Sequence, residues 1–216
     1  MKFTPRTWLK SAASAAVLTL MLGGCVSAPD TRAAVASKTW QIDAAQSSVN
    51  FVTLKAGQAG VGGVAEVQAF RRFSGALSAD GQIKFTIDLA SVDTGVDIRD
   101  ERLRTMLFNV GATPQATFTA KLDAATLKGI DASSSRDVDV EGALSLAGSS
   151  KPVAAKLRVV RLGNDAMMVT TRAPIVVNAN DHGMRAGVEA MREVMGLNFL
   201  ASSAPVTFAL VLNEKR

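Results

Sequence analysis

One cysteine and one histidine, Cys25 and His182, are the side chains of this sequence best suited to nucleophilic or metal chemistry. Nucleophilic centres usually pair a serine or cysteine with a histidine, and zinc sites gather several thiolate or imidazole ligands. His182 stands in the polar run Asn178-Ala179-Asn180-Asp181-His182-Gly183, which suits a turn and a helix cap. We therefore predict no metal site and no enzymatic activity.

A charged cluster between Arg99 and Arg104 is the other candidate for chemistry. Its two carboxylates, Asp100 and Glu101, could form the pair of an acid–base site. They alternate with arginines at helical spacing, and that spacing is typical of local salt bridges on a helix. We interpret the cluster as a salt-bridged helix surface.

Cys25 follows the pattern of a lipoprotein-type cleavage site. Three basic residues within the first ten precede an apolar block from Ala12 to Leu22, and Gly23-Gly24 comes directly before the cysteine. The block is too short to span a bilayer comfortably. We expect residues 1–24 to be a signal peptide and Cys25 to carry acyl chains such as palmitate. Acylation would also cap the only thiol of the chain in an oxidising compartment.

Two other readings of this segment stay open: a signal cleaved near Ala34-Val35-Ala36 without lipidation, and an uncleaved membrane anchor. Acyl chains contribute about 0.8 kcal/mol per buried methylene, so a lipidated Cys25 would hold the protein at a membrane. The following residue is Val26 rather than an acidic one. For a Gram-negative cell this favours the periplasmic face of the outer membrane.

The charge balance excludes a nucleic-acid partner. Removing residues 1–24 removes three basic and no acidic residues, so the formal charge of +5 falls to +2. Residues 25–37 are small and polar without a period, which suits a flexible tether. Residues 38–216 have the size of one domain with its own core.

Period-two alternation recurs along this domain and predicts its fold class. In Ala116 to Leu122, for example, alanine, phenylalanine and leucine face one way, whereas threonine and lysine face the other. Gly142 stands on an apolar strand face, where a missing side chain marks a bend or a close approach. The expected strands are 48–54, 61–70, 73–78, 84–89, 116–122, 137–147, 153–162, 167–177 and 206–212, with hairpin turns at 79–81 and 162–165.

So many amphipathic strands must either stack as a sandwich or close into a barrel. Long strands joined by short hairpins favour an all-β, lipocalin-like closed antiparallel β-barrel of about eight strands. Two short helices are expected, at about 98–107 with Asp97 as N-cap and at about 184–196. The small or slim inward residues would leave volume inside the barrel.

Several motifs of the chain resemble the central signature of the YceI-like family. They are Trp40-Gln41-Ile42-Asp43, Ser48-Val49-Asn50-Phe51, Ser91-Val92-Asp93-Thr94, Arg99-Asp100-Glu101-Arg102-Leu103, Phe108, Pro114-Gln115-Ala116-Thr117-Phe118, the run from Val140 to Gly148, and Lys151-Pro152-Val153. The resemblance implies a periplasmic barrel that encloses a polyisoprenoid such as a quinone-like lipid. Members often have a histidine, a leucine and a glycine where Lys55-Ala56-Gly57 stands here, and only part of the family has a lipid anchor.

From this resemblance we predict an envelope lipoprotein that binds a long apolar lipid for carriage, storage or sequestration. The alternative is a structural or interaction module of the envelope with a filled barrel. Candidates for contact with the lipid head group are Lys55, Arg71, Arg72 and His182. The inward residues predicted to contact the tail are Phe51, Phe85, Ile87, Leu89, Phe118, Val140, Leu144, Leu146 and Phe208.

Overall fold

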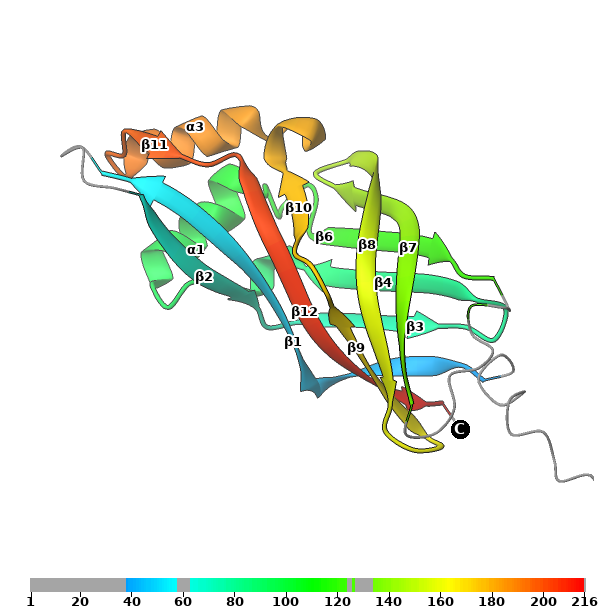
Figure 1. Cartoon of the computed structure of the whole chain (residues 1–216). Helices are drawn as coiled ribbons and strands as arrows, with labels where there is room; N and C mark the ends of the chain where they lie inside the picture. Colours follow the sequence, from blue (N-terminus) through cyan, green and yellow to red (C-terminus); the bar gives the residue numbers. More distant parts are fainter. Residues whose placement is uncertain (1–37, 58–62, 124–125, 127–133, 216) are drawn as a thin grey trace, which may run out of the picture. The chain divides into compact units, whose positions relative to one another are not determined.

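The computed structural model describes residues 38–57, 63–123, 126 and 134–215. The predicted signal peptide 1–24, the acylated Cys25 and the tether 25–37 lie outside the described residues. The domain is built from strands, with short helices inserted before β6 and before β11 (Figure 1).

The strands are β1 (Trp40–Ala56), β2 (Val64–Phe70), β3 (Phe73–Leu77), β4 (Gln82–Asp88), β5 (Val92–Asp93), β6 (Gln115–Lys121), β7 (Ser135–Leu146), β8 (Ser149–Arg161), β9 (Ala166–Thr171), β10 (Ile175–Asn178), β11 (Phe199–Leu200) and β12 (Ser203–Glu214). The helical segments are the 3-10 turns η2 (Leu89–Ser91) and η4 (Ala179–His182), the α-helices α1 (Asp97–Arg102) and α3 (Arg185–Val194), and the π-helical turn η3 (Leu103–Leu107).

Within the described residues, eight strands close into an antiparallel barrel, as the alternating pattern predicts. The order around the barrel is β1-β12-β9-β8-β7-β6-β4-β3, and β3 returns to β1 through the pairs Trp40 with Leu77 and Gln41 with Ala76. The predicted hairpin turns are confirmed, since β3 pairs with β4 and β8 pairs with β9.

Strand β1 belongs to two parts of the sheet. Its pairing register with β12 shifts between Asp43 and Ser48, where the Asp43 carboxylate accepts a hydrogen bond from the Ala45 amide at 3.0 Å. Before this bulge β1 pairs with β3, and after it β1 pairs with β2 from Val49 to Lys55. A bulge bends a strand. The second half of β1 therefore turns away from β3 and pairs with β2 instead.

Several boundaries differ from the sequence prediction, including the start of β1, which is Trp40 rather than residue 48. The single strand expected at 167–177 is two strands, β9 and β10, because Pro174 lies between them and β10 pairs with β12 further along. The N-cap prediction at Asp97 is wrong: α1 begins at Asp97 itself, and no side chain caps it. Instead, the Asp100 carboxylate accepts hydrogen bonds from the Thr94 amide and hydroxyl at 2.8 and 2.7 Å.

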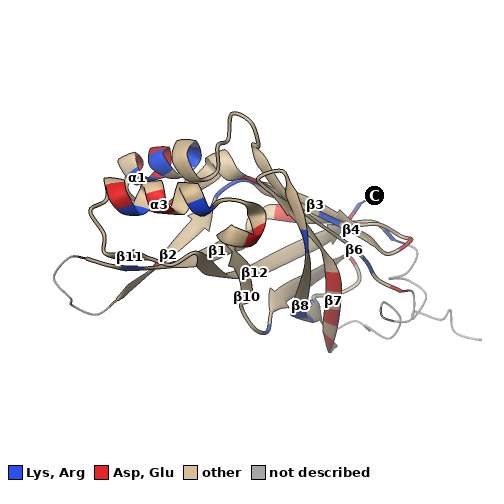
Figure 2. Cartoon of the chain, turned by 90° about the horizontal axis from the view of Figure 1, so that it is seen from above, with Lys and Arg blue, Asp and Glu red and all other residues tan. Residues whose placement is uncertain are grey.

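The helices α1 and α3 lie on the same side of the domain, near β2 and β11 (Figure 1). A glycine allows α3 to approach η3 closely, because a Cβ atom on Gly187 would stand 2.7 Å from the Met106 carbonyl oxygen. Charged residues gather on both helices, whereas β10 and β12 are mostly free of them (Figure 2). Helix α3 therefore presents its polar face outward and its apolar residues Val188 and Met191 to the barrel.

Candidate binding cavity

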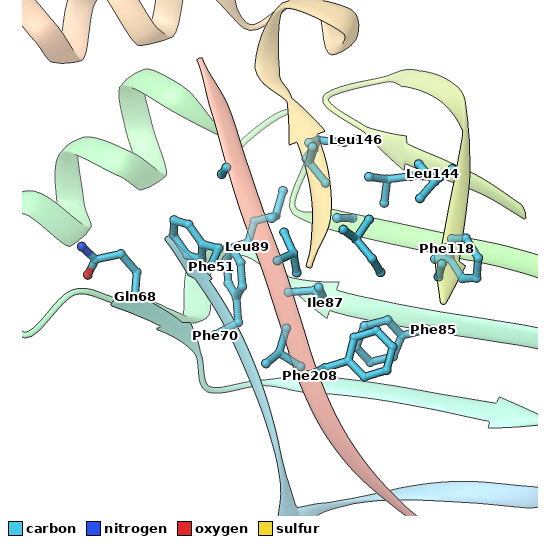
Figure 3. A pocket seen from close by; sticks show the side chains of 18 of the residues that line it. Phe51, Gln68, Phe70, Phe85, Ile87, Leu89, Phe118, Leu144, Leu146 and Phe208 are labelled. Carbon is cyan, nitrogen blue, oxygen red and sulfur yellow. The ribbon is translucent and has the colours of Figure 1, made fainter. Parts of the chain in front are cut away.

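A cavity of about 320 Å³ lies inside the barrel, and its lining is almost entirely apolar (Figure 3). Inward side chains of the barrel strands and of β2 and β10 form most of its wall. All the residues predicted to contact a lipid tail line it, namely Phe51, Phe85, Ile87, Leu89, Phe118, Val140, Leu144, Leu146 and Phe208. The structure thus brings these residues together, and their contact with a lipid stays a prediction.

Several lining side chains are only partly buried although they point inward. Ile87, Phe118 and Leu144 keep exposed area, whereas Trp40 at the start of β1 is fully buried. A tightly packed core covers such side chains on all sides, so their exposed area faces the cavity. The aromatic rings line it in pairs, with centroids 5.1 Å apart for Phe51 and Phe70 and 6.3 Å apart for Phe85 and Phe208.

Gly142 shapes one wall of the cavity. A Cβ atom at this position would overlap the Thr119 carbonyl oxygen and the Phe118 ring. The close approach predicted from the sequence is therefore confirmed. Because Phe118 can lie against the backbone of β7 at Gly142, its ring leaves the centre of the barrel open.

One end of the cavity is polar, and two neighbouring strands form it together. Along β1 the inward residues change from Val49 and Phe51 to Thr53 and Lys55, all of which line the cavity. Along β2 they change from Phe70 to Gln68 and Glu66. Thr53 pairs with Glu66 across the two strands, and Phe51 pairs with Gln68. We name Thr53, Lys55, Glu66, Gln68 and Arg99 of α1 the polar end.

Glu66 is the centre of the charges at the polar end. Its carboxylate accepts from Lys55 Nζ at 2.8 Å and from Arg99 Nη1 at 2.9 Å. The hydrogen bond from Lys55 lowers the pKa of Glu66, burial opposes this change, and the positive charge of Arg99 lowers the pKa further. Glu66 is therefore ionised at neutral pH and joins β2 to both β1 and α1.

Gln68 is the most deeply buried polar residue of the polar end. Its side chain is 2% exposed, and its Nε2 atom donates to Thr53 Oγ1 at 3.3 Å. Its Oε1 atom has no hydrogen-bond partner within the described part of the chain. In Figure 3 the amide lies beyond Phe51 and Phe70, at the end of the cavity away from Phe118.

The charged cluster between Arg99 and Arg104 fixes α1 beside the polar end. Asp100 holds the Thr94 loop, and Arg104 donates to the Ala90 carbonyl at 2.9 Å and to the Val92 carbonyl at 3.4 Å. The local salt bridges that we expected are present between Arg104 and Glu101 at 3.6 Å and between Arg104 and Asp100 at 4.0 Å. Arg99 instead reaches Glu66 on β2, a contact that helical spacing alone does not reveal.

The predicted head-group residues are dispersed. Lys55 lies at the polar end, whereas Arg71 and Arg72 are largely exposed and pair with Asp93 and Asp88 away from the cavity lining. His182 is 4% exposed and places its Nδ1 atom 3.1 Å from the Ser149 carbonyl, beside a separate surface hollow.

Gln68, Glu66 and Arg99 are absent from the sequence-based set of site residues. The signal for two of them was present, because Glu66, Gln68 and Phe70 alternate within the predicted strand 61–70 and so share a face. In the portion that the structure describes, no cluster of histidine, cysteine or carboxylate side chains could hold a metal ion. No helix of that portion has the length and apolar character needed to cross a membrane.

A closed antiparallel barrel with an apolar interior and polar groups at one end is the architecture of small-ligand-binding barrels. A profile of the YceI-like domain matches residues 40–212, and the chain belongs to this family. It is 35% identical over 103 residues to a UPF0312 protein of Pseudomonas paraeruginosa, and 34% identical over 103 residues to protein YceI of Escherichia coli. Each match covers 44% of this chain and 50% of the relative, so the chain spans about half the length of these relatives.

Solved structures match over a longer stretch. A polyisoprenoid-binding domain from Saccharophagus degradans, implicated in plant cell wall breakdown, superposes with a TM-score of 0.75 and 33% sequence identity. That match covers 82% of this chain and 98% of the other. BcnA of Burkholderia cenocepacia has a TM-score of 0.55 at 19% identity, covers 79% of this chain and 98% of its own, and shows the shared fold alone.

Proposed function

We propose that this protein binds a long apolar lipid, a polyisoprenoid or quinone-like molecule, inside its barrel. The observation that carries the proposal is the apolar cavity of about 320 Å³ lined by inward side chains of a closed barrel. Burial of an apolar tail gains about 25 cal/mol per Å² relative to water. The polyisoprenoid-binding domain of Saccharophagus degradans, with the same fold at 33% identity, supports this ligand class.

Lipid carriage between membranes needs more than an apolar wall. A tail gains about as much in a bilayer as in the barrel, so this contribution largely cancels when the lipid moves from one to the other. Occupancy then depends on head-group bonds, on packing against the wall and on the ordering of the chain. Of these three contributions, the head-group bonds would come from the polar end.

Native mass spectrometry of the purified full chain, followed by organic extraction, tests the proposal. We expect a bound mass that is released as a long apolar lipid, or uptake of an added polyisoprenoid by empty protein. A barrel that contains no lipid and takes up none would contradict it. The alternative, an interaction module of the envelope, is supported by exposed apolar side chains such as Val67, Val176 and Phe199, which are 71%, 65% and 48% exposed.

We further propose that acylated Cys25 anchors the protein at the periplasmic face of the envelope, in the outer membrane. The support is the sequence around Cys25, which lies outside the described residues. Labelling with radioactive palmitate should mark the wild-type chain and leave Cys25→Ala unlabelled. Label on the variant, or recovery of unlabelled wild-type protein in the soluble fraction, would contradict the anchor.

A further inference from the structure

Toward the polar end, the inward side chains of β1 and β2 become more polar step by step. On both β1 and β2 the inward row passes from apolar residues, through a neutral residue, to a charged residue. A ligand that matches this order has an apolar tail beside Phe51 and Phe70 and a neutral polar group beside Thr53 and Gln68. The charged pair of Lys55 and Glu66 then lies beyond that group.

The buried amide of Gln68 indicates which neutral group fits. Its nitrogen already donates to Thr53, whereas its oxygen has no partner among the described residues although the residue is 2% exposed. Buried acceptors in native proteins nearly always accept a hydrogen bond, because leaving one unpaired is costly. A ligand donor reaching this oxygen removes that cost. An ether or a quinone carbonyl, which only accepts, does not.

The charges at the polar end disfavour an anionic head group. Lys55 and Arg99 both already bind the carboxylate of Glu66, at 2.8 and 2.9 Å. A phosphate that approached these cations would come close to a second anion and would have to displace it. Like charges this near repel each other most strongly where solvent is partly excluded, and the side chains of Lys55 and Arg99 are 23% and 21% exposed.

Resting on the lipid binding proposed above, we propose that the ligand is an isoprenoid alcohol, whose uncharged hydroxyl donates a hydrogen bond to Gln68 Oε1. Glu66 selects against the phosphorylated form of the same lipid by occupying Lys55 and Arg99. Gln68 is thus a specificity-determining residue, and Glu66 is the residue that rejects the anion.

Three probes with the same tail test this assignment: geranylgeraniol, its methyl ether and its monophosphate. Each competes with the neutral fluorophore N-phenyl-1-naphthylamine for the purified full chain. We expect the alcohol to bind about tenfold more tightly than the ether, as a buried hydrogen bond to an otherwise unpaired group implies. The monophosphate should bind more weakly than the alcohol.

Two substitutions separate the two roles. Gln68→Met keeps the side-chain volume and removes the amide, so the alcohol and the ether should bind equally while ether binding is unchanged. Gln68→Leu gives a second version should the first fail to fold. Gln115→Leu on β6 is the matched control, because this glutamine is exposed and does not line the cavity. Glu66→Gln should strengthen monophosphate binding about tenfold. The same variant should still bind the alcohol more tightly than the methyl ether.

The outcomes distinguish this inference from the proposed function. If none of the probes displaces the fluorophore from the wild-type chain, lipid binding itself is contradicted. If the alcohol and the ether bind equally to the wild-type chain, or if the preference for the alcohol persists without Gln68, the head-group assignment is overturned while lipid binding stands. Monophosphate binding tighter than alcohol binding by the wild-type chain would overturn the role of Glu66.

Discussion

The two ends of β1 bury polar groups in different surroundings. At its start, Trp40 is fully buried and the Arg161 guanidinium lies 4.7 Å from the centre of its ring. The last residues of β1 belong to the polar end, where Gln68 and Glu66 of β2 line the cavity. Both regions contain polar atoms that have no hydrogen-bond partner among the described residues: Trp40 Nε1, Arg161 Nε and Arg161 Nη1 at the start, and Gln68 Oε1 at the far end.

The surroundings decide what an unpaired atom means. Arg161 does not line the cavity; one of its nitrogens donates to the Asn164 carbonyl at 2.8 Å, and the face of Trp40 partly replaces other partners. Burial lowers the pKa of Arg161, and the negative charges of Asp165 and Glu214 oppose that change. The group at the start of β1 is therefore part of the packing, whereas Gln68 adjoins space that a ligand can occupy.

Among the single changes proposed for these two regions, removing Trp40 should lower the free energy of unfolding the most. Trp40→Ala deletes a fully buried side chain beside Leu77 and Arg161, the last residue of β8, and such a deletion costs about 3–5 kcal/mol. Urea unfolding followed by circular dichroism measures the loss, with the smaller Trp40→Phe change as control. The ratio of alcohol to ether binding should survive in the folded fraction. A loss below about 1 kcal/mol would contradict a packing role for this end.

Asp100→Ala should be the next largest change, this time beside the polar end. The buried carboxylate accepts two hydrogen bonds from Thr94, and bonds to a charged group contribute about 1.5–3 kcal/mol. We expect a loss of about 2 kcal/mol in urea unfolding. Asp97→Ala in the same helix is the matched control, because Asp97 is exposed and should change stability by less than about 0.5 kcal/mol. Equal losses in both variants would refute the special role of Asp100.

The barrel could be predicted because each strand carries its own signal. Alternation in segments such as Ala116 to Leu122 fixes which side chains face inward, and all nine predicted tail residues do line the cavity. The start of β1 was missed because Asp43 to Ser47 interrupts the alternation at the bulge. Extra residues at a bulge shift the alternation of inward and outward side chains, so a strict period of two is lost there.

The polar end could be predicted only in part. The sequence points to Lys55 but equally to Arg71 and Arg72, because a positive charge in the sequence does not reveal its partner. Asp93 and Asp88 bind those two arginines away from the cavity. The partner of Arg99 comes from β2, thirty-three positions earlier in the chain, and only the folded barrel brings the two together.

Filling the cavity should separate lipid binding from stability. Leu144→Trp adds volume to an inward, partly exposed side chain on β7, so the tail loses space while the barrel stays folded. We expect lipid affinity to fall about tenfold or more with an unfolding free energy within about 1 kcal/mol of the wild type. Ser145→Trp, on the neighbouring outward position, is the control and should bind lipid normally. Unchanged affinity for Leu144→Trp would mean that the lipid does not occupy this cavity.

Acid should weaken the polar end and leave the packing of Trp40 and Arg161 intact. The folded-state pKa of Glu66 is lowered from 4.5, so its ion pairs stabilise the fold above that pH and are lost as pH falls through the lowered value. The side chain is 30% exposed, which limits the loss to less than about 1 kcal/mol.

Other carboxylates with lowered pKa values, such as Asp80 at about 2, add to the acid dependence of the whole protein. The contribution of Glu66 is therefore the difference between wild type and Glu66→Gln, measured by urea unfolding from pH 6 to pH 3. The variant should have the flatter curve, and parallel curves would contradict an ionised Glu66 in its ion pairs. Arg161 does not titrate in this range, so Arg161→Met should leave the pH dependence of the unfolding free energy unchanged. A changed pH dependence in this variant would show that the two ends of β1 are coupled.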